Sequence, residues 1–163
     1  STGSTSEAAG RVCLCPFDQV QRYRGRVSGP LLDRIDLHVL VDAVPYRDYA
    51  KAGSGEPTAV IRKRVERARA AQAKRLGVGR TNARMKDADV REIVQQDPAI
   101  LRTLERAIDV LGLSTRAVGR ILKVDRTIAD LEGAARVSVP HVTEAVGFRV
   151  LDRQPAFEDM EAA

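Results

Sequence analysis

The last two thirds of the sequence are a series of predicted helices, most of which begin with a capping residue. This series constrains the fold more than any other feature. From Thr58, apolar or small side chains recur every three or four residues until Gly77, a pattern that predicts an amphipathic helix. The residues that recur at this spacing are Ile61, Val65, Ala68, Gln72 and Leu76.

Four more helices are predicted beyond Gly79, each from a capping side chain or a proline at its start. Their expected first or capping residues are Asp87, Asp97-Pro98, Ser114 and Pro140. Glycine follows the apolar stripe of two of them, at Gly112 and Gly133, and is a common helix stop. The sequence therefore predicts a bundle of five helices.

The N-terminal third has a different pattern. A short helix is predicted over residues 16–26, and the apolar run at residues 35–41 predicts a strand. This run is nearly continuous, as in a strand buried on both faces of a parallel sheet, although its sheet partners would be missing. A connection centred on Gly53-Ser54-Gly55 separates this region from the helices, and we expect a domain boundary there.

The composition supports a core of packed helices. Apolar residues make up 44% of the 163 residues, but aromatic residues only 4%, so the core must consist of Ala, Val, Ile and Leu. The net charge of +5 fits either a polyanionic partner or solvated helix faces. The sequence has no apolar run of membrane-spanning length, and residues 1–10 do not resemble a signal peptide. Two cysteines two positions apart favour a reducing cytoplasm.

The motifs of a complete nucleotide site are absent from the sequence. There is no G-x-x-x-x-G-K-[S/T] loop to surround phosphates, and no apolar strand ends in Asp-Glu to hold magnesium. Neither His38 nor His141 stands in an interpretable relation to a serine or cysteine nucleophile, so both are expected to be structural. We therefore expect no catalysis by this chain alone.

Two segments resemble a known family. The first is Ser-Gly-Pro-Leu-Leu-Asp-Arg-Ile-Asp at residues 28–36, and the second covers residues 113–133 and includes Arg-Thr-Ile-Ala-Asp-Leu. Together they resemble the C-terminal part of the magnesium-chelatase-like AAA+ ATPases, on the branch of the competence-associated ComM proteins. The resemblance covers roughly residues 13–153.

The resemblance implies a mainly α fold: a C-terminal helical lid preceded by a short remnant of the α/β core, namely a finger turn and one strand. The expected divisions are a linker or tag (1–12), the end of the core (13–45), a linker (46–57), the lid (58–153) and a flexible tail (154–163). It also implies an intact ATPase that binds ATP and Mg²⁺, and whose subunits form a ring with six as the expected number. The ComM branch implies DNA remodelling, such as branch migration. The chelatase branch implies instead a motor subunit that remodels a metal-inserting partner.

The resemblance also implies roles for three arginines. Arg34 would be an arginine finger that acts on the γ-phosphate bound by the neighbouring subunit; the alternative is a surface ion pair with Asp33 or Asp36. Arg116 would be the sensor-2 arginine, which reaches ATP phosphates from the lid. Arg126 is the second candidate for that role, but Asp125 stands where the family generally has alanine and could pair with Arg126.

A basic helix gives a second, independent hypothesis about function. Basic residues crowd the predicted helix that begins at Thr58, where Glu66 is the only acid: Arg62, Lys63, Arg64, Arg67, Arg69, Lys74 and Arg75. They predict either a solvated face or salt-dependent contacts with nucleic-acid phosphates, in which Arg62, Lys63, Arg64, Arg67 and Arg69 are the candidates. The alternative to an ATPase lid is therefore a freestanding basic helical module that binds nucleic acid.

The cysteines give a weaker signal. Cys13 and Cys15 are half of a possible metal site, and related proteins carry another cysteine cluster just upstream. Two thiolates cannot complete a four-coordinate zinc site, and neither histidine has ligand spacing to them. We therefore expect no metal to bind this chain.

Overall fold

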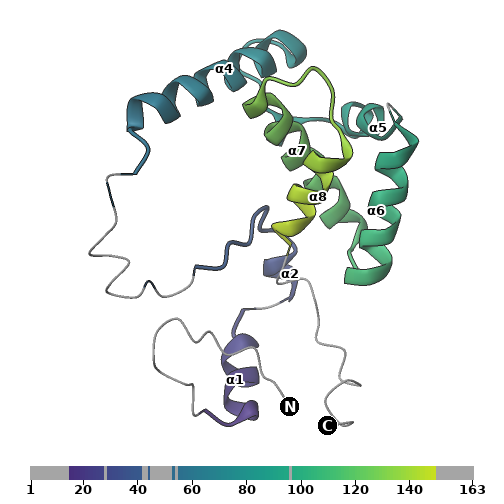
Figure 1. Cartoon of the computed structure of the whole chain (residues 1–163). Coiled ribbons are helices and arrows are strands. Elements are labelled where there is room, and N and C mark those ends of the chain that lie inside the picture. Colours follow the sequence, from purple (N-terminus) through teal and green to yellow (C-terminus); the bar gives the residue numbers. More distant parts are fainter. Residues whose placement is uncertain are drawn as a thin grey trace.

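The computed structural model describes residues 15–27, 29–41, 44, 53, 55–95 and 97–149. Within these ranges all regular secondary structure is helical, and Figure 1 shows most of it gathered in one bundle. The elements are α1 (Phe17–Arg24), α2 (Gly29–Leu32), α4 (Thr58–Leu76), the 3₁₀ helix η2 (Asn82–Arg84), α5 (Asp87–Gln95), α6 (Pro98–Leu111), α7 (Thr115–Glu132) and α8 (Val139–Gly147). The predicted mainly α fold is confirmed.

Local capping explains why the helix boundaries were predictable. The Asp97 side chain accepts a hydrogen bond from the backbone N–H of Ala99 at the start of α6, and Ser114 accepts one from Ala117 at the start of α7. Gly133 ends α7 at a φ of 80°, a left-handed conformation that glycine adopts without steric cost.

Helix α7 is the centre of the bundle. It packs against α4, α5 and α8, and α8 also packs against α6. The core is aliphatic, as the composition required, and its most completely buried side chains include Ile100, Ile121, Ala129 and Val142. Phe148, at the end of α8, packs against this core from its edge.

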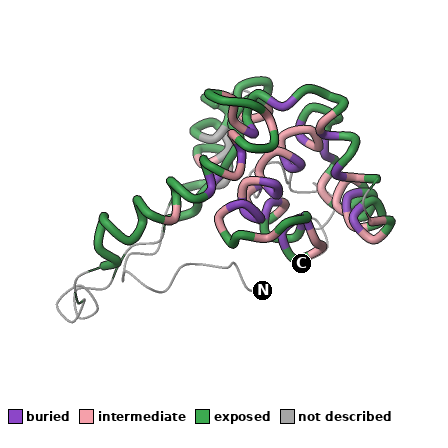
Figure 2. The backbone as a smooth tube through the Cα atoms, turned by 90° about the horizontal axis from the view of Figure 1, so that it is seen from above, coloured by how far each residue is buried: buried purple, intermediate pink, exposed green. Residues whose placement is uncertain are grey.

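Only the second half of α4 is part of the bundle. Ala68 and Gln72 are buried, but Ile61 and Val65, which belong to the same helical pattern, are exposed. Figures 1 and 2 show the reason: the first half of α4 extends beyond the helices that cover its second half. An amphipathic pattern predicts which side of a helix is apolar, but not what covers that side.

The expected strand at residues 35–41 is not confirmed, because these residues form neither helix nor strand. A strand needs the backbone of a second strand, and the part of the chain that the structure describes supplies none. The segment instead lies against the end of α8, where the backbone N–H of His38 donates to the carbonyl of Phe148 (2.8 Å). Residues 39–41 are exposed.

The expected linker at 1–12 and tail at 154–163 lie outside the described residues, as does much of 46–57. Among the helices that the structure describes, none combines the length and the apolar character that a membrane span requires.

Candidate functional site

One face of α7 forms the floor of a cavity of about 620 Å³. The first half of the helix contributes Arg116, Arg120 and Lys123, and the second half contributes Val124, Ile128 and Leu131. The walls come from residues 36–37, α5, η2 and α8. The cavity, which we call the α7 groove, therefore combines cations from the first half of α7 with apolar side chains from its second half, and its lining also contains the acids Asp36, Asp87 and Glu144.

Arg34 is exposed in the turn that follows α2. The acids on either side of it are engaged elsewhere, since Asp33 pairs with Arg116 and Asp36 pairs with Arg120. The alternative expected from the sequence, an ion pair of Arg34 with Asp33 or Asp36, is therefore not formed. Within the described ranges no acid neutralises the Arg34 guanidinium.

Arg116 lines the α7 groove and reaches from the first turn of α7 to the turn that carries Arg34. Its Nη1 lies 3.1 Å from Oδ2 of Asp33, while the Ser114 hydroxyl donates to Oδ1 of the same carboxylate (2.6 Å). The Ser114 hydrogen bond, helped by Arg116, holds the pKa of Asp33 below its usual range, although partial desolvation opposes the shift. The Arg116 side chain remains 61% exposed, so it is free to change partners.

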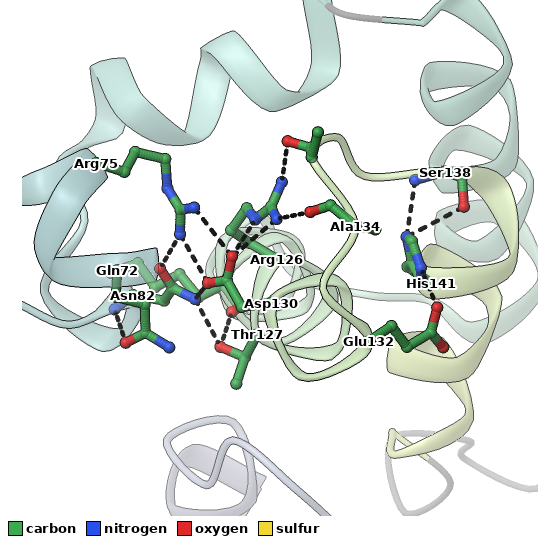
Figure 3. A network of polar contacts seen from close by, with 12 residues as sticks. Gln72, Arg75, Asn82, Arg126, Thr127, Asp130, Glu132, Ala134, Ser138 and His141 are labelled. Carbon is green, nitrogen blue, oxygen red and sulfur yellow. Dashed lines mark hydrogen bonds and ion pairs between the residues drawn. The ribbon is translucent and has the colours of Figure 1, made fainter. Parts of the chain in front are cut away.

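Arg126 lies elsewhere, buried and fully engaged. Its guanidinium donates to Asp130 (2.8 Å) and to the carbonyls of Ala134 (2.7 Å) and Ala135 (3.2 Å), as Figure 3 shows in part. The partner is Asp130, one helical turn on, and not the adjacent Asp125 that the sequence suggested. The second candidate for the sensor-2 role is thus held inside the bundle, whereas Arg116 faces the groove.

Asp130 is the centre of a polar cluster that joins α4, η2 and α7 (Figure 3). Both of its carboxylate oxygens accept from Arg75 (2.9 and 2.7 Å), and Asn82 donates to it as well (2.8 Å). Burial alone would raise the pKa of Asp130, but the bonds from Arg75 and Asn82 and the charge of Arg126 hold it below its usual value. Arg75 is therefore neutralised by Asp130, unlike the exposed basic residues of α4.

Asp125 has the opposite environment. It is completely buried, and neither of its carboxyl oxygens has a hydrogen-bond partner within the part of the chain that the structure describes. Burial raises the pKa of Asp125 to about 8, against a smaller opposing effect of the neighbouring Arg126. The carboxyl is therefore mostly protonated at neutral pH.

The remaining basic residues of α4 divide into two groups. Arg64 pairs with Glu56 through two contacts of 3.1 and 3.0 Å. The other candidates for nucleic-acid contact are exposed and make no ion pair with any described acid: Arg62, Lys63, Arg67 and Arg69. Lys74 is also exposed and has no ion pair with a described acid.

The histidines have structural contacts. His38 is buried with Nε2 3.3 Å from the carbonyl of Leu32, and His141 completes the N-terminal capping box of α8 with Ser138 while its Nε2 contacts Glu132 (2.9 Å; Figure 3). Cys15 is exposed, and Cys13 lies outside the described residues. Across the ranges that the structure describes, no three potential metal ligands gather in one place.

Sequence reasoning missed the partners of these groups. The pairing of Arg126 with Asp130 has a sequence signal, because residues four apart meet on one side of a helix. The contacts of Asp33 and Asp36 with α7 join positions 83 and 84 apart and have no such signal.

Comparison with known proteins identifies the family. The family described as magnesium chelatase, subunit ChlI C-terminal, matches residues 55–149, and the family described as magnesium chelatase, subunit ChlI, matches residues 1–49. Together the two matches cover the groove, the turn that carries Arg34 and the basic helix.

Individual relatives of this chain support the same family assignment. Competence protein ComM of Haemophilus influenzae is 40% identical over 136 residues, which is 83% of this chain and 26% of that protein. The uncharacterized proteins YifB of Salmonella typhimurium (40% over 142 residues) and Rv2897c of Mycobacterium tuberculosis (37% over 139) are matched over 85% and 84% of this chain and 27% of their own lengths. The chain thus spans about a quarter of the length of these relatives. On these matches, the chain belongs to the magnesium chelatase subunit ChlI family, and its residues 55–149 match the C-terminal part of that family.

Proposed function

We propose that this chain is the C-terminal part of a ComM-type AAA+ ATPase, in which it supplies the arginine finger and the sensor-2 lid for ATP hydrolysis. The observation that carries the proposal is the environment of Arg34. The turn around it is docked on the lid by Asp33 and Asp36, yet its own guanidinium is exposed and is not neutralised by any acid that the structure describes. A fixed, uncompensated arginine can stabilise charge that develops on a phosphoryl group held by a neighbouring subunit.

The α7 groove supports the second half of the proposal. Arg116, Arg120 and Lys123 are the donor types that bind phosphate, and the apolar end of the groove is suited to a nucleobase. Arg116 would contact the phosphates of ATP, while the phosphate loop and the Mg²⁺ ligands would come from the rest of the ATPase core. Bound Mg²⁺ would neutralise part of the negative charge of the phosphates.

The work done by the motor follows from the likeness to competence protein ComM. We infer DNA remodelling by a homo-oligomeric ring, with six subunits as the expected number. The exposed cations of α4 support this choice over a chelatase motor subunit, because they offer a phosphate-binding surface on the same domain.

Mixed rings test the role of Arg34. In the full-length form of this chain, Arg34→Ala should lower ATP turnover by about 10³- to 10⁵-fold while ATP binding and ring assembly persist, because a finger acts mainly in the transition state. Rings mixed from Arg34→Ala subunits and subunits with a replaced phosphate-loop lysine should regain partial activity, since some interfaces then combine an intact loop with an intact finger.

Arg102→Ala is the matched control, because Arg102 is an exposed arginine on α6 that does not line the groove. This variant should keep the wild-type rate. Mixed rings that assemble but recover no activity would show that Arg34 does not act across the interface.

A further inference from the structure

We propose that the first half of α4 is a docking surface for an acidic segment of the same chain, Phe-Glu-Asp-Met-Glu at residues 157–161. This segment lies outside the described residues and beyond residues 55–149, which match the family of C-terminal domains. The docking does not depend on the proposed function, although one consequence of it, for DNA binding, does.

The surface contains an apolar stripe that is exposed. Ile61 and Val65 are four positions apart and lie on the side of α4 that carries the buried Ala68 and Gln72 further along. Yet Ile61 is 39% exposed and Val65 is 43% exposed, because this half of α4 extends beyond the described helices that cover the second half (Figures 1 and 2). A segment with apolar side chains could cover the stripe without any change to the bundle.

The two borders of the stripe differ in charge. Arg62 and Arg69 are seven positions apart, so they lie nearly in line along one border. Both are exposed, and neither pairs with an acid in the ranges that the structure describes. On the other border, Arg64 is already paired with Glu56. The surface therefore suits an occupant that brings apolar groups to the stripe and acids to one border.

This combination of features discriminates between the possible occupants. Nucleic acid could use the cations, but it would leave Ile61 and Val65 in water, because contacts with phosphates need no apolar stripe. A second copy of α4 would bring the basic borders of two helices together, and like charges repel. An acidic segment with apolar residues meets both requirements.

The segment at 157–161 has that chemistry. It contains three acids and no base, together with two apolar residues, Phe157 and Met160, both of which bury well against aliphatic side chains. From Arg149, the last described residue, an extended chain spans up to about 26 Å to Phe157 and about 40 Å to Glu161. These spans are comparable with the whole length of α4, which is about 28 Å.

The consequence for DNA follows from the proposed function. The docked segment would occupy Arg62 and Arg69 and would compete with phosphates for them. Lys63 and Arg67 lie on the opposite side of the helix and would stay accessible. The segment would therefore weaken DNA binding and not abolish it.

Amide hydrogen exchange of the 163-residue chain tests the docking. In Phe157→Ala/Met160→Ala, which keeps every charge, exchange of residues 61–66 should become at least about threefold faster, because opening of this half of α4 no longer requires release of the segment. Exchange of residues 68–76 should not change, which shows that the bundle remains folded. Unchanged exchange of residues 61–66 in this variant would overturn the docking.

The charged border has a matched control. Arg62→Gln/Arg69→Gln should raise the exchange of the same amides, relative to their intrinsic rates, whereas Lys63→Gln/Arg67→Gln removes equal charge from the opposite side and should not. Equal effects of the two pairs would overturn the assignment of the border. Protection of residues 61–66 that grows with protein concentration would also overturn the proposal, because the occupant would then be a second molecule.

A titration with duplex DNA separates the docking from the proposed function. Phe157→Ala/Met160→Ala should raise DNA affinity by about two- to fivefold at constant net charge, since a competitor is removed. If exchange becomes faster in this variant but DNA affinity does not change, the docking stands and the contact of Arg62 and Arg69 with DNA fails.

Discussion

Replacing Asp125 with alanine should stabilise this chain, and the gain should grow with pH. In the folded state the pKa of this carboxyl is about 8, against 3.8 as its ordinary value. A raised carboxyl pKa means that folding retains a proton that the unfolded chain releases above about pH 4. The free energy of unfolding therefore falls by up to about 1.4 kcal/mol for each pH unit from about pH 4 to 8, and levels off above that.

At pH 7 the Asp125 carboxyl thus costs up to about 4 kcal/mol relative to an exposed one. Water entry and relaxation reduce this figure, and alanine leaves a small void, so we expect a net gain of about 1–3 kcal/mol at pH 7. The gain should nearly vanish toward pH 4, where the carboxyl is protonated in both states.

Urea unfolding between pH 5 and pH 8.5 measures the effect as the difference between the two stability curves. Asp109→Ala, at an exposed position of α6, is the matched control and should run parallel to the wild type. Asp125→Asn separates charge from volume, because it removes the titration but keeps a buried polar group. A difference between Asp125→Ala and the wild type that stays constant from pH 5 to pH 8 would refute the reasoning, because the carboxyl would then titrate normally.

Two further predictions concern the Asp130 cluster and the basic helix. Asp130→Ala should destabilise the fold by about 3–5 kcal/mol, measured by thermal or urea unfolding, because it leaves the buried Arg126 without its counterion; an effect below about 1 kcal/mol would mean that the cluster is solvated. Duplex DNA should bind the chain weakly, without sequence preference and less tightly as salt rises, in a titration at two salt concentrations. Glutamine at Arg62, Lys63, Arg67 and Arg69 together should reduce this binding, and unchanged affinity would mark these cations as an ordinary solvated surface.

Helix boundaries were accessible from the sequence because capping is local. The Asp97 and Ser114 caps bond to residues two and three positions ahead, so their spacing is legible in the chain itself. Burial along α4 is not local in this way, because Ile61 shares the helical spacing of Ala68 but is exposed where no other described helix covers it.

The candidate site could be predicted only in part, because its contacts join segments that are distant in the sequence. Arg34 and Arg116 were named through family resemblance, but the contact of the Asp33 carboxylate with Arg116 was not foreseen, and the only pairing considered for Asp33 was the alternative of an ion pair with Arg34. The family's usual alanine drew attention to Asp125, yet the counterion of Arg126 proved to be Asp130, and only coordinates show which acid lies within reach.

Only the second half of α4 is packed against other described helices, so the first half can unwind and lengthen the connection to the bundle. Its second half is fastened by Gln72 and by the bond of Arg75 to Asp130, while its first half has no buried side chain and opens at little cost. Amide protons of residues 61–66 should therefore exchange with solvent faster than those of 68–76, within one continuous helix. Because helical chain rises about 1.5 Å per residue and extended chain about 3.3 Å, melting two turns would lengthen the connection by about 13 Å. Thr58 can thus move away from the bundle while the Asp130 cluster stays intact.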